Sequence, residues 1–487
     1  MGIIFKQSLK NTTITYLGFG IGAINTLFLY TRFLTDEYFG LVGVILSTSA
    51  ILMPLMAFGV PNTLVKYYSK FDGSESTDGF LTLMLVLPLI IILPLAGISY
   101  FANELIGNFL ASKNSIVKDY VWYIFLIGLA MAYFEIFYAW SKVHMKSVFG
   151  NFMKEVLVRV GVSILLLSLY AGFISVDFFL KALVGLYLLR TLIMKLYAYS
   201  LRRPRLSIRW PSGSRAMVSY SILIILGGST AVILLEIDRF MINQFIPIQN
   251  VAYYTVAIFI ATVIAVPARA MHQITYPLTA AILNRDDINE LQSLYQRSSL
   301  TLFIVSGLIF VLILLNLNDF YMLLPEAYRG GYIIVLLIGL TKLFDALMGN
   351  NNAILYNSDY YKVLLLMGVF LAACTILFNW ILIPAYGLNG AALATFIAIC
   401  IYNLIKLIYV KRKFNILPFT HETLRIVGLL VFTGIIFYFV KFNFSPLINI
   451  ALKSILITVF YVGILYRFKI SKDVFEVLSG FFDRKRR

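Results

Sequence analysis

Long uninterrupted apolar runs are the feature that most limits what this chain can fold into. Runs of about 20 apolar residues recur along its whole length, and each can cross the ~30 Å hydrocarbon core of a bilayer. The runs are continuous rather than alternating, and backbone exposed to lipid must be helical or closed into a barrel. Because 60% of the 487 residues are hydrophobic and 13% are charged, a soluble domain could not bury this much apolar surface. The sequence therefore predicts an all-α polytopic membrane protein.

Hydropathy predicts about fourteen transmembrane helices. The first run is full length and lacks a small-residue cleavage site, so we interpret it as a retained helix rather than a signal peptide. No connection between the runs is long enough to hold a soluble domain. The predicted spans are residues 11–33, 41–63, 79–102, 119–141, 152–173, 178–200, 217–246, 251–282, 298–318, 332–356, 363–383, 388–410, 423–441 and 448–467.

The formal net charge of +17 could indicate nucleic-acid binding, but the positions of the charges argue against it. Cations gather in alternate connections, as the positive-inside rule produces in membrane proteins. All of these connections fall on one side if the N-terminus is cytoplasmic, so both termini are predicted to be cytoplasmic. The basic sites are Lys66 with Lys70, Lys142 with Lys146, five arginines in "LRRPRLSIRWPSGSR" at 201–215, Arg285 with Arg297, "KRK" at 411–413 and "RKRR" at 484–487.

The arginine-rich linker after the sixth span divides the chain into two halves of six spans each. An even number of spans gives both halves the same orientation, with a shared cavity between them. The predicted domains are a six-helix bundle at 1–201, a basic cytoplasmic linker at 202–215, a second six-helix bundle at 216–413, an extra helix pair at 414–467 and a basic cytoplasmic tail at 468–487.

The openings of the two halves indicate an internal repeat. Each half has Arg-Phe at the end of its first helix, then an aromatic pair, then Val-Pro inside its second helix. Arg32 precedes Pro61 by 29 positions, and Arg239 precedes Pro267 by 28 positions. The helix-end motif of Arg32, Asp238 and Arg239 is interpreted either as an interfacial anchor with a tight turn or as a functional feature.

These residues carry a resemblance to a known family. "TRFLTDEYFG" with "AFGVPNTLVKYYS", then "LEIDRFMINQF" with "VAYYTVA", is similar to the polysaccharide-biosynthesis branch of the MOP superfamily, the Wzx-type O-antigen and exopolysaccharide flippases. "YAWSKVHMKSVFGNF" and "PAYGLNGAALAT" also resemble that family, and the likeness extends from Lys6 to about Val410.

The resemblance implies two six-helix bundles around a central cavity, with an extra C-terminal helix pair. It implies a flippase that moves an undecaprenyl-pyrophosphate-linked oligosaccharide from the inner to the outer leaflet of a bacterial or archaeal cytoplasmic membrane. The implied partners are the lipid-linked oligosaccharide and membrane lipids, with polymerase and chain-length enzymes of the same pathway as further candidates.

Charged and amide side chains within the spans of the second half are candidates for contact with such a cargo, since charges at this depth usually face a cavity or a partner. Arg269 could bind a pyrophosphate or form a structural ion pair with an acid on a neighbouring helix. His272, one turn further on, could bind substrate, sense protons or simply pack. Lys342 and Asp345 share a helix face, so they could neutralise each other, or bind the anion and couple to an ion. Asn350 could bind sugar hydroxyls or line a hydrated vestibule.

In the first half, Glu135 and Arg159 could pair across the bundle. Alternatively, Glu155 could pair with Arg159, since the two are four residues apart on one helix. We interpret these residues as structural or coupling ion pairs.

The motifs exclude some kinds of chemistry and leave two alternatives open. The sequence has no catalytic constellation, no phosphate-binding P-loop and no His/Cys cluster, so we expect no enzyme activity, cofactor or metal. A cation-coupled multidrug antiporter of the same superfamily is the first alternative, but it would favour acidic cavity residues. A membrane glycan polymerase or ligase is the second, but it would need larger external loops than this chain has.

Overall fold

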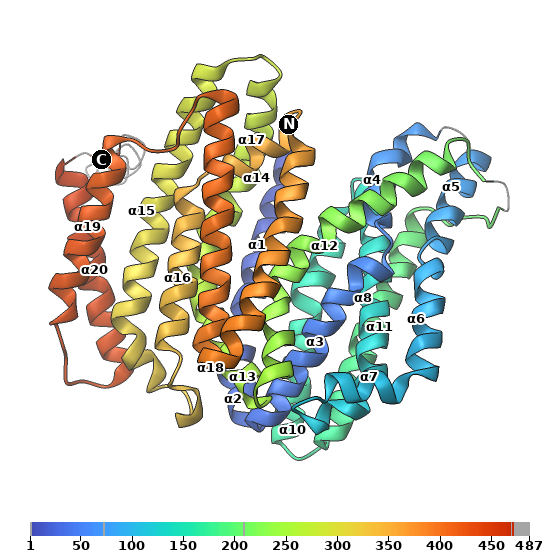
Figure 1. Cartoon of the computed structure of the whole chain (residues 1–487), viewed down its shortest axis with the longest axis horizontal. Coiled ribbons are helices and arrows are strands. Elements are labelled where there is room, and N and C mark those ends of the chain that lie inside the picture. Colours follow the sequence, from blue (N-terminus) through green and yellow to red (C-terminus); the bar gives the residue numbers. More distant parts are fainter. Residues whose placement is uncertain (1, 72–73, 208–209, 469, 472–487) are drawn as a thin grey trace. The chain divides into compact units, whose positions relative to one another are not determined.

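The computed structural model describes residues 2–71, 74–207, 210–468 and 470–471, and every regular element in these ranges is helical (Figure 1). Elements labelled η are 3-10 or π turns. In the first part of the chain the elements are α1 (Gly2–Ile24), η1 (Asn25–Leu29), α2 (Tyr30–Phe33), α3 (Asp36–Met56), α4 (Val60–Tyr67), η2 (Tyr68–Lys70), α5 (Ser74–Val86), α6 (Leu89–Phe101), α7 (Asn103–Leu110), η3 (Ser115–Tyr120), α8 (Val121–Val143), α9 (Ser147–Phe152), η4 (Met153–Leu157), α10 (Val158–Tyr170), α11 (Val176–Leu201) and α12 (Ser214–Phe245).

The remaining elements follow in the same way. They are α13 (Gln249–Thr262), η5 (Val263–Ala265), α14 (Val266–Leu283), α15 (Ile288–Tyr321), η6 (Glu326–Tyr328), α16 (Tyr332–Leu347), α17 (Asn351–Asn357), α18 (Tyr361–Phe414), α19 (His421–Tyr438) and α20 (Pro446–Phe468). Most of the predicted tail, residue 469 and residues 472–487, lies outside the described residues.

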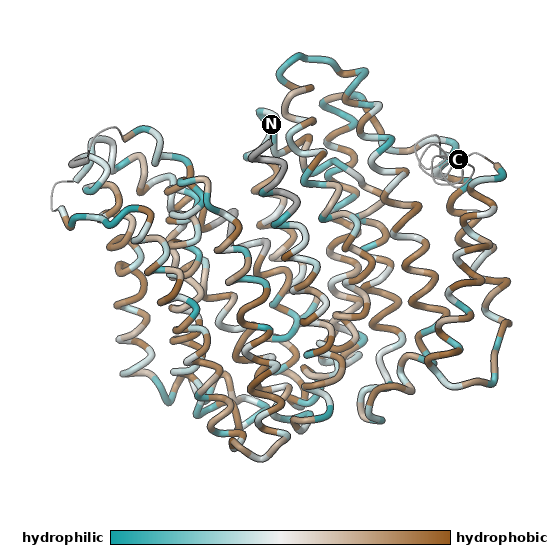
Figure 2. Tube along the Cα trace, turned by 180° about the vertical axis from the view of Figure 1, so that it is seen from behind, coloured by the Kyte–Doolittle hydropathy of each residue, from teal (hydrophilic) through white to brown (hydrophobic). Residues whose placement is uncertain are grey.

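The all-α polytopic class is confirmed, while the number of fourteen spans is not. Among the described residues, nine helices are long and apolar enough to cross a membrane, and the number is ten if α16 and α17, which are bent by 56° at their break, are counted as one span. The long helix α18 contains two predicted spans, 363–383 and 388–410, on either side of Gly387, whose φ of 57° and ψ of −134° are not helical. Figure 2 shows apolar residues along the helices and hydrophilic residues at many helix ends and connections.

Chain contacts divide the protein into two compact units. Unit 1 consists of residues 1–255 with 368–387, and unit 2 consists of residues 256–367 with 388–487. The first arm of α18 therefore belongs to unit 1, although the residues before it and after it belong to unit 2.

The two Val-Pro pairs do not lie inside a continuous second helix, as the sequence suggested. Each stands at the first residue of a new helical segment. Gly59 adopts φ 65° and α4 then begins at Val60–Pro61, whereas the 3-10 turn η5 precedes α14, which begins at Val266–Pro267. Proline fits the first turn of a helix because the N–H at that position has no helical acceptor. The same break therefore recurs at corresponding places in the repeat.

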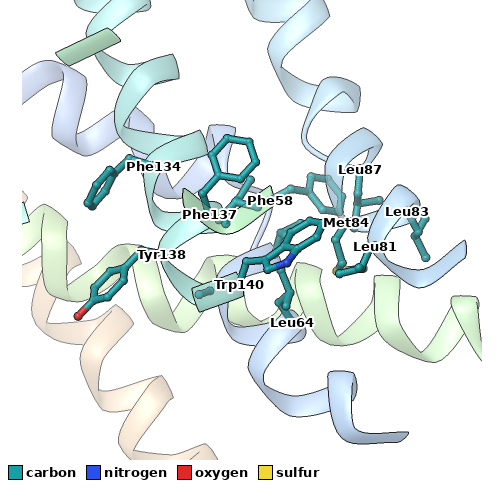
Figure 3. Packing of buried hydrophobic residues seen from close by; sticks show 14 of the residues in the cluster. Phe58, Leu64, Leu81, Leu83, Met84, Leu87, Phe134, Phe137, Tyr138 and Trp140 are labelled. Atoms are coloured by element: carbon teal, nitrogen blue, oxygen red, sulfur yellow. The ribbon is translucent and has the colours of Figure 1, made fainter. Parts of the chain in front are cut away.

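Unit 1 has an aromatic core around the inner part of α8. Trp140 and Phe134 are almost fully buried, and they pack with Phe80, Met84 and Leu64 of the preceding helices (Figure 3). This core fixes α8, which carries Glu135 and Lys142.

Unit 2 has two apolar cores. One packs α15 against the C-terminal pair α19 and α20, through residues such as Phe303, Ile426 and Tyr461. The other surrounds Tyr295 and Ile354, where α14, α15, α17 and the end of α18 meet. The second core holds the polar break between α16 and α17 in place.

Candidate functional site

A slot on α1 holds the side chain of Arg159 in unit 1. Gly18 and Gly22 lie four residues apart on one face of α1. A Cβ at Gly18 would lie 2.6 Å from Arg159 Nη1, and a Cβ at Gly22 would lie 3.1 Å from its Nε. Arg159 follows the start of α9 by twelve residues, about 18 Å of helix, so the slot lies deep within the span. The two glycines let a guanidinium lie against a helix where alanine would leave no room.

The Arg159 guanidinium is held by one residue. Its Nη1 donates to the backbone carbonyl of Glu155 at 2.6 Å and to the Glu155 carboxylate at 2.7 Å. Of the two pairings that the sequence allowed, the structure contains Glu155 with Arg159. The Arg159 side chain is still 35% exposed. A charge held in one orientation and partly exposed at this depth can bind an anion.

Glu135 pairs with a different cation. It accepts a bond of 2.6 Å from Lys154 Nζ, and the Lys154 side chain is 43% exposed. The Glu135 side chain is 19% exposed, so the pair is partly buried rather than a surface salt bridge. The pair holds a partly exposed cation on η4, the π turn that precedes Arg159.

Arg190 of α11 is a buried cation that the sequence analysis missed. The residue is 6% exposed, its guanidinium carbon lies 4.0 Å from the ring centroid of Phe134, and its Nε has no hydrogen-bond partner among the described residues. Lys142 lies 3.8 Å from the Tyr138 ring nearby. We name the following residues the inner charge cluster: Glu135, Lys142, Lys154, Glu155, Arg159 and Arg190. The inner charge cluster has four cations and two carboxylates.

The π turn η1 packs next to this cluster. Asn25 begins η1, is buried, and donates from Nδ2 to the Arg159 carbonyl at 2.8 Å. Its Oδ1 accepts from Ser163 Oγ at 2.6 Å. The second π turn, η4, ends two residues before Arg159, which is the second residue of α10. π turns often mark functional sites. Two of them lie next to Arg159, so they indicate the same part of unit 1 as the inner charge cluster does.

Asp238 of the helix-end motif is a buried structural residue in unit 1. It accepts hydrogen bonds of 2.7 Å from the Tyr254 hydroxyl and 2.7 Å from Asn379 Nδ2. The two donors come from α13 and from the first arm of α18. Asp238 therefore joins three helices of unit 1.

The two arginines of the helix-end motif differ in their surroundings. Arg239 donates to Glu236 at 2.5 Å and to Thr255 Oγ1 at 3.1 Å, and its side chain is 19% exposed. Arg32 is exposed. The helix-end motif thus contains one buried acid, one partly buried arginine and one exposed arginine, and its role as anchor or functional feature stays a prediction.

The break between α16 and α17 is the polar centre of unit 2. Gly349 adopts φ 53°, and a Cβ there would lie 2.8 Å from the backbone of Ser299, so only glycine fits. Asn350, a predicted substrate-binding residue, is buried and donates to the Thr279 hydroxyl of α14. Its Oδ1 is buried and has no partner in the described part of the chain. The break thus directs amide groups into the interior of unit 2.

Lys406 is a second buried cation that the sequence analysis missed. It is 2% exposed, donates to Asn352 Oδ1 at 2.9 Å and lies 4.1 Å from the Tyr402 ring centroid. Among the described residues no carboxylate lies within ion-pair distance of its ammonium. Burial of such a cation costs several kcal/mol, so Lys406 lowers the stability of the fold.

Asp345 and Lys342 are not joined in an ion pair among the described residues. Asp345 accepts instead from Asn403 Nδ2 at 2.7 Å. Asp345 is exposed, and Lys342 is partly exposed on the same helix. No contact in the described structure therefore supports the interpretation that Lys342 and Asp345 neutralise each other.

Arg269 and His272 lie on one face of α14, a different face from the one that packs on α15. Arg269 is exposed, and His272 is partly buried with its ring 5.6 Å from that of Tyr276. The charged groups that act on His272 are Asp345 and Lys406. Asp345 and Lys406 therefore lie near His272 in unit 2, and Arg269 and Lys342 are further cations on α14 and α16.

Comparisons with known proteins agree with this architecture. Residues 4–283 match a protein family described as "Polysaccharide biosynthesis protein". The fold is similar to the lipid II flippase MurJ in an inward closed conformation, with a TM-score of 0.68 and 16% identity over 95% of this chain and 99% of that one.

Two further structures share the fold. An inward-facing multidrug resistance MATE family transporter of the MOP superfamily has a TM-score of 0.62 and 15% identity over 83% of this chain and 94% of that one. A MOP superfamily transporter from Pyrococcus furiosus has a TM-score of 0.53 and 14% identity over 84% of this chain and 96% of that one. No curated protein sequence matched the chain.

Proposed function

The chain belongs to the polysaccharide biosynthesis protein family, and on that premise we propose that it is a lipid-linked oligosaccharide flippase. Its cargo is an undecaprenyl-pyrophosphate-linked oligosaccharide, a repeat unit of O-antigen or exopolysaccharide. Alternating access moves this cargo from the cytoplasmic to the outer leaflet of the cytoplasmic membrane. Both termini lie in the cytoplasm, the side on which the basic connections gather.

The excess of cations over carboxylates in one set of charged residues in each unit is the observation that carries this proposal. The inner charge cluster of unit 1 has four cations and two carboxylates, and the set of Arg269, Lys342, Lys406 and Asp345 in unit 2 has three cations and one carboxylate. Each group therefore has a net charge of +2. A cation within a span costs about 2.5–3.5 kcal/mol, so cations such as Arg159 and Arg269 within predicted spans are expected where an anion passes.

Arg159 and Arg269 are the residues we assign to the pyrophosphate. Both are accessible deep within a span, and Arg159 is already oriented by Glu155. A guanidinium can bind two phosphate oxygens at once, which an ammonium cannot do. Lys342 and His272 supply further positive or hydrogen-bonding groups in unit 2, and the membrane potential favours outward movement of an anion by about 2.3 kcal/mol per charge per 100 mV.

The same charge balance argues against a multidrug antiporter. An antiporter for organic cations would need an excess of carboxylates in these groups, whereas cations outnumber them in both units. The proteins with the same fold are transporters and a flippase, which supports a transport role over a polymerase or ligase. Polymerase and chain-length enzymes of the same pathway are the proposed partners.

The domain division proposed with this function is the one that the sequence predicts. It has two six-helix bundles at 1–201 and 216–413, and the linker at 202–215 joins them in the cytoplasm. The pair at 414–467 is an addition to the bundles, and the tail at 468–487 lies in the cytoplasm.

Export by single-residue variants tests the proposal. In cells that lack the gene, we expect Arg269→Ala and Arg159→Ala to insert in the membrane but to restore less than about a tenth of the surface glycan. Arg425→Ala, at an exposed arginine of α19, is the matched control and should restore export. Surface glycan is measured by gel and lectin staining, and insertion by immunoblotting of membranes. Wild-type export by both variants would contradict the assignment.

A further inference from the structure

A groove between α14 and α15 has one apolar wall and one polar wall. The two helices are antiparallel neighbours in unit 2, and the hollow between them has a volume of about 660 Å³. Met271, Ile274 and Leu278 form the wall on α14, at the i, i+3 and i+7 spacing of one helix face. The wall on α15 includes Ser293 and Arg297, with Ser298 and Thr301 following at helical spacing. A groove of this kind fits an amphiphile rather than a purely apolar or purely polar ligand.

A buried hydroxyl in this groove has no partner. Thr275 lines the groove, is 6% exposed, and its Oγ1 makes no hydrogen bond within the described residues. Threonine in a helix normally donates to the carbonyl four residues earlier, as Thr279 does to the carbonyl of Thr275 at 2.7 Å. A ligand oxygen in the groove would satisfy this hydroxyl, since buried polar groups without partners are rare.

The groove is lined by one cation and one carboxylate. Glu290 and Arg297 line it, and Glu290 is bonded at 2.8 Å to Arg285 in the turn next to it. The Glu290 carboxylate is thus already bonded to a residue outside the groove, and Arg297 is the cation among the lining residues. Across the groove from Arg297, α14 presents exposed apolar side chains: Ile274 is 66% exposed and Leu278 is 47% exposed.

The length of α15 places Arg297 near the membrane surface. With 34 residues, α15 is about 51 Å long, roughly 20 Å more than the hydrocarbon core. Arg297 lies nine residues after its first residue, about 13.5 Å along the helix. If the turn before α15 is cytoplasmic, as in the proposed function, Arg297 lies at the headgroups of the inner leaflet.

We propose that this groove is a binding site for an anionic phospholipid of the cytoplasmic leaflet. The phosphate binds Arg297, the glycerol oxygens lie near Ser293 and Thr275, and an acyl chain follows the apolar wall past Ile274. Basic pockets between transmembrane helices on the cytoplasmic side are known to hold anionic headgroups. The inference uses only the cytoplasmic placement of this turn from the proposed function.

Lipid retention by the purified full-length protein tests the site. Native mass spectrometry in detergent compares dioleoyl-phosphatidylglycerol with dioleoyl-phosphatidylcholine, which has the same acyl chains. We expect the wild type to prefer phosphatidylglycerol, and Arg297→Gln to weaken that binding at least about fivefold while Arg297→Lys retains part of it. The control Arg425→Gln, outside the groove, should bind as the wild type does.

A second pair of variants tests the shape of the groove without changing charge. Ile274→Trp fills the groove and should also lose phosphatidylglycerol, whereas Leu366→Trp, at a side chain 70% exposed elsewhere in unit 2, should retain it. Equal binding of both lipids, or unchanged binding by Arg297→Gln and Ile274→Trp, would overturn the proposal. Displacement of phosphatidylglycerol by an equal amount of undecaprenyl phosphate would overturn it too, because the groove would then hold the cargo lipid. Lipid binding is measured without transport, so this site can fail while the flippase function stands.

Discussion

Replacement of Gly18 by alanine is the perturbation whose effect the structure defines best. A Cβ at Gly18 would lie 2.5 Å from the Glu155 carbonyl oxygen and 2.6 Å from Arg159 Nη1. The oxygen belongs to the backbone of the π turn η4, so it cannot move by a simple side-chain rotation. To reach ordinary contact distance, α1 and η4 must separate by about 0.9 Å, or Arg159 must leave its slot.

Two opposing effects set the magnitude. Overpacking of this kind costs about 1–3 kcal/mol, whereas Gly→Ala in a helix gains about 0.5–1 kcal/mol through backbone entropy. Gly20→Ala has the same gain in helix propensity, but a Cβ at Gly20 would meet nothing within 4 Å. The difference in stability between the two variants therefore measures the overpacking alone. Gly18→Ala should therefore be less stable than Gly20→Ala by about 1–3 kcal/mol.

Thermal unfolding in detergent measures this difference. We expect the apparent melting temperature of Gly18→Ala to lie a few degrees below that of Gly20→Ala, and export to fall in the first variant alone. If both variants unfold at the same temperature and export normally, the slot does not constrain Arg159, and our reasoning about its orientation is wrong.

Three further predictions use matched comparisons. Gly59→Ala should melt at a lower temperature than Gly213→Ala, because both glycines have positive φ but only the Cβ at Gly59 would collide with the backbone of α12; equal melting temperatures would contradict this. A double-mutant cycle of Lys342→Ala and Asp345→Ala, measured by thermal unfolding, should give a coupling energy below about 0.5 kcal/mol, and a larger value would show that the two residues interact despite the missing ion pair. Lys406→Met should be at least as stable as the wild type, because it keeps the volume and removes a buried charge; a loss above about 3 kcal/mol would show that the charge itself stabilises unit 2.

Much of the fold could be predicted from the sequence because hydropathy reports directly on helices that must satisfy their own backbone in lipid. The breaks within the spans could not be predicted from hydropathy. Gly59 and Gly349 adopt positive φ where another backbone approaches closely, and that approach comes from helices far away in the sequence. Hydropathy changes little across such a glycine, so the sequence shows one long run where the structure has two segments.

The candidate site could be predicted only where the partners are close in the sequence. Glu155 and Arg159 are one turn apart, so helical spacing identifies them as a possible pair. The partner of Glu135 is Lys154, on another helix, and no local rule connects the two. Lys406 lies near the end of a predicted span, where an ordinary lysine would extend its charge to the membrane surface. Its burial depends on the amide of Asn352, which the break after α16 brings to it.

The lipid-linked intermediates of cells that lack this gene test the central claim most directly. Mass spectrometry should find a complete undecaprenyl-pyrophosphate oligosaccharide that accumulates in the inner leaflet, out of reach of an enzyme added outside, while surface polymer is lost. Absence of any accumulation, together with new sensitivity to cationic drugs, would contradict the flippase and favour the antiporter. Accumulation of an unpolymerised glycan that an external enzyme can already reach would also contradict it, because the cargo would then have crossed without this protein.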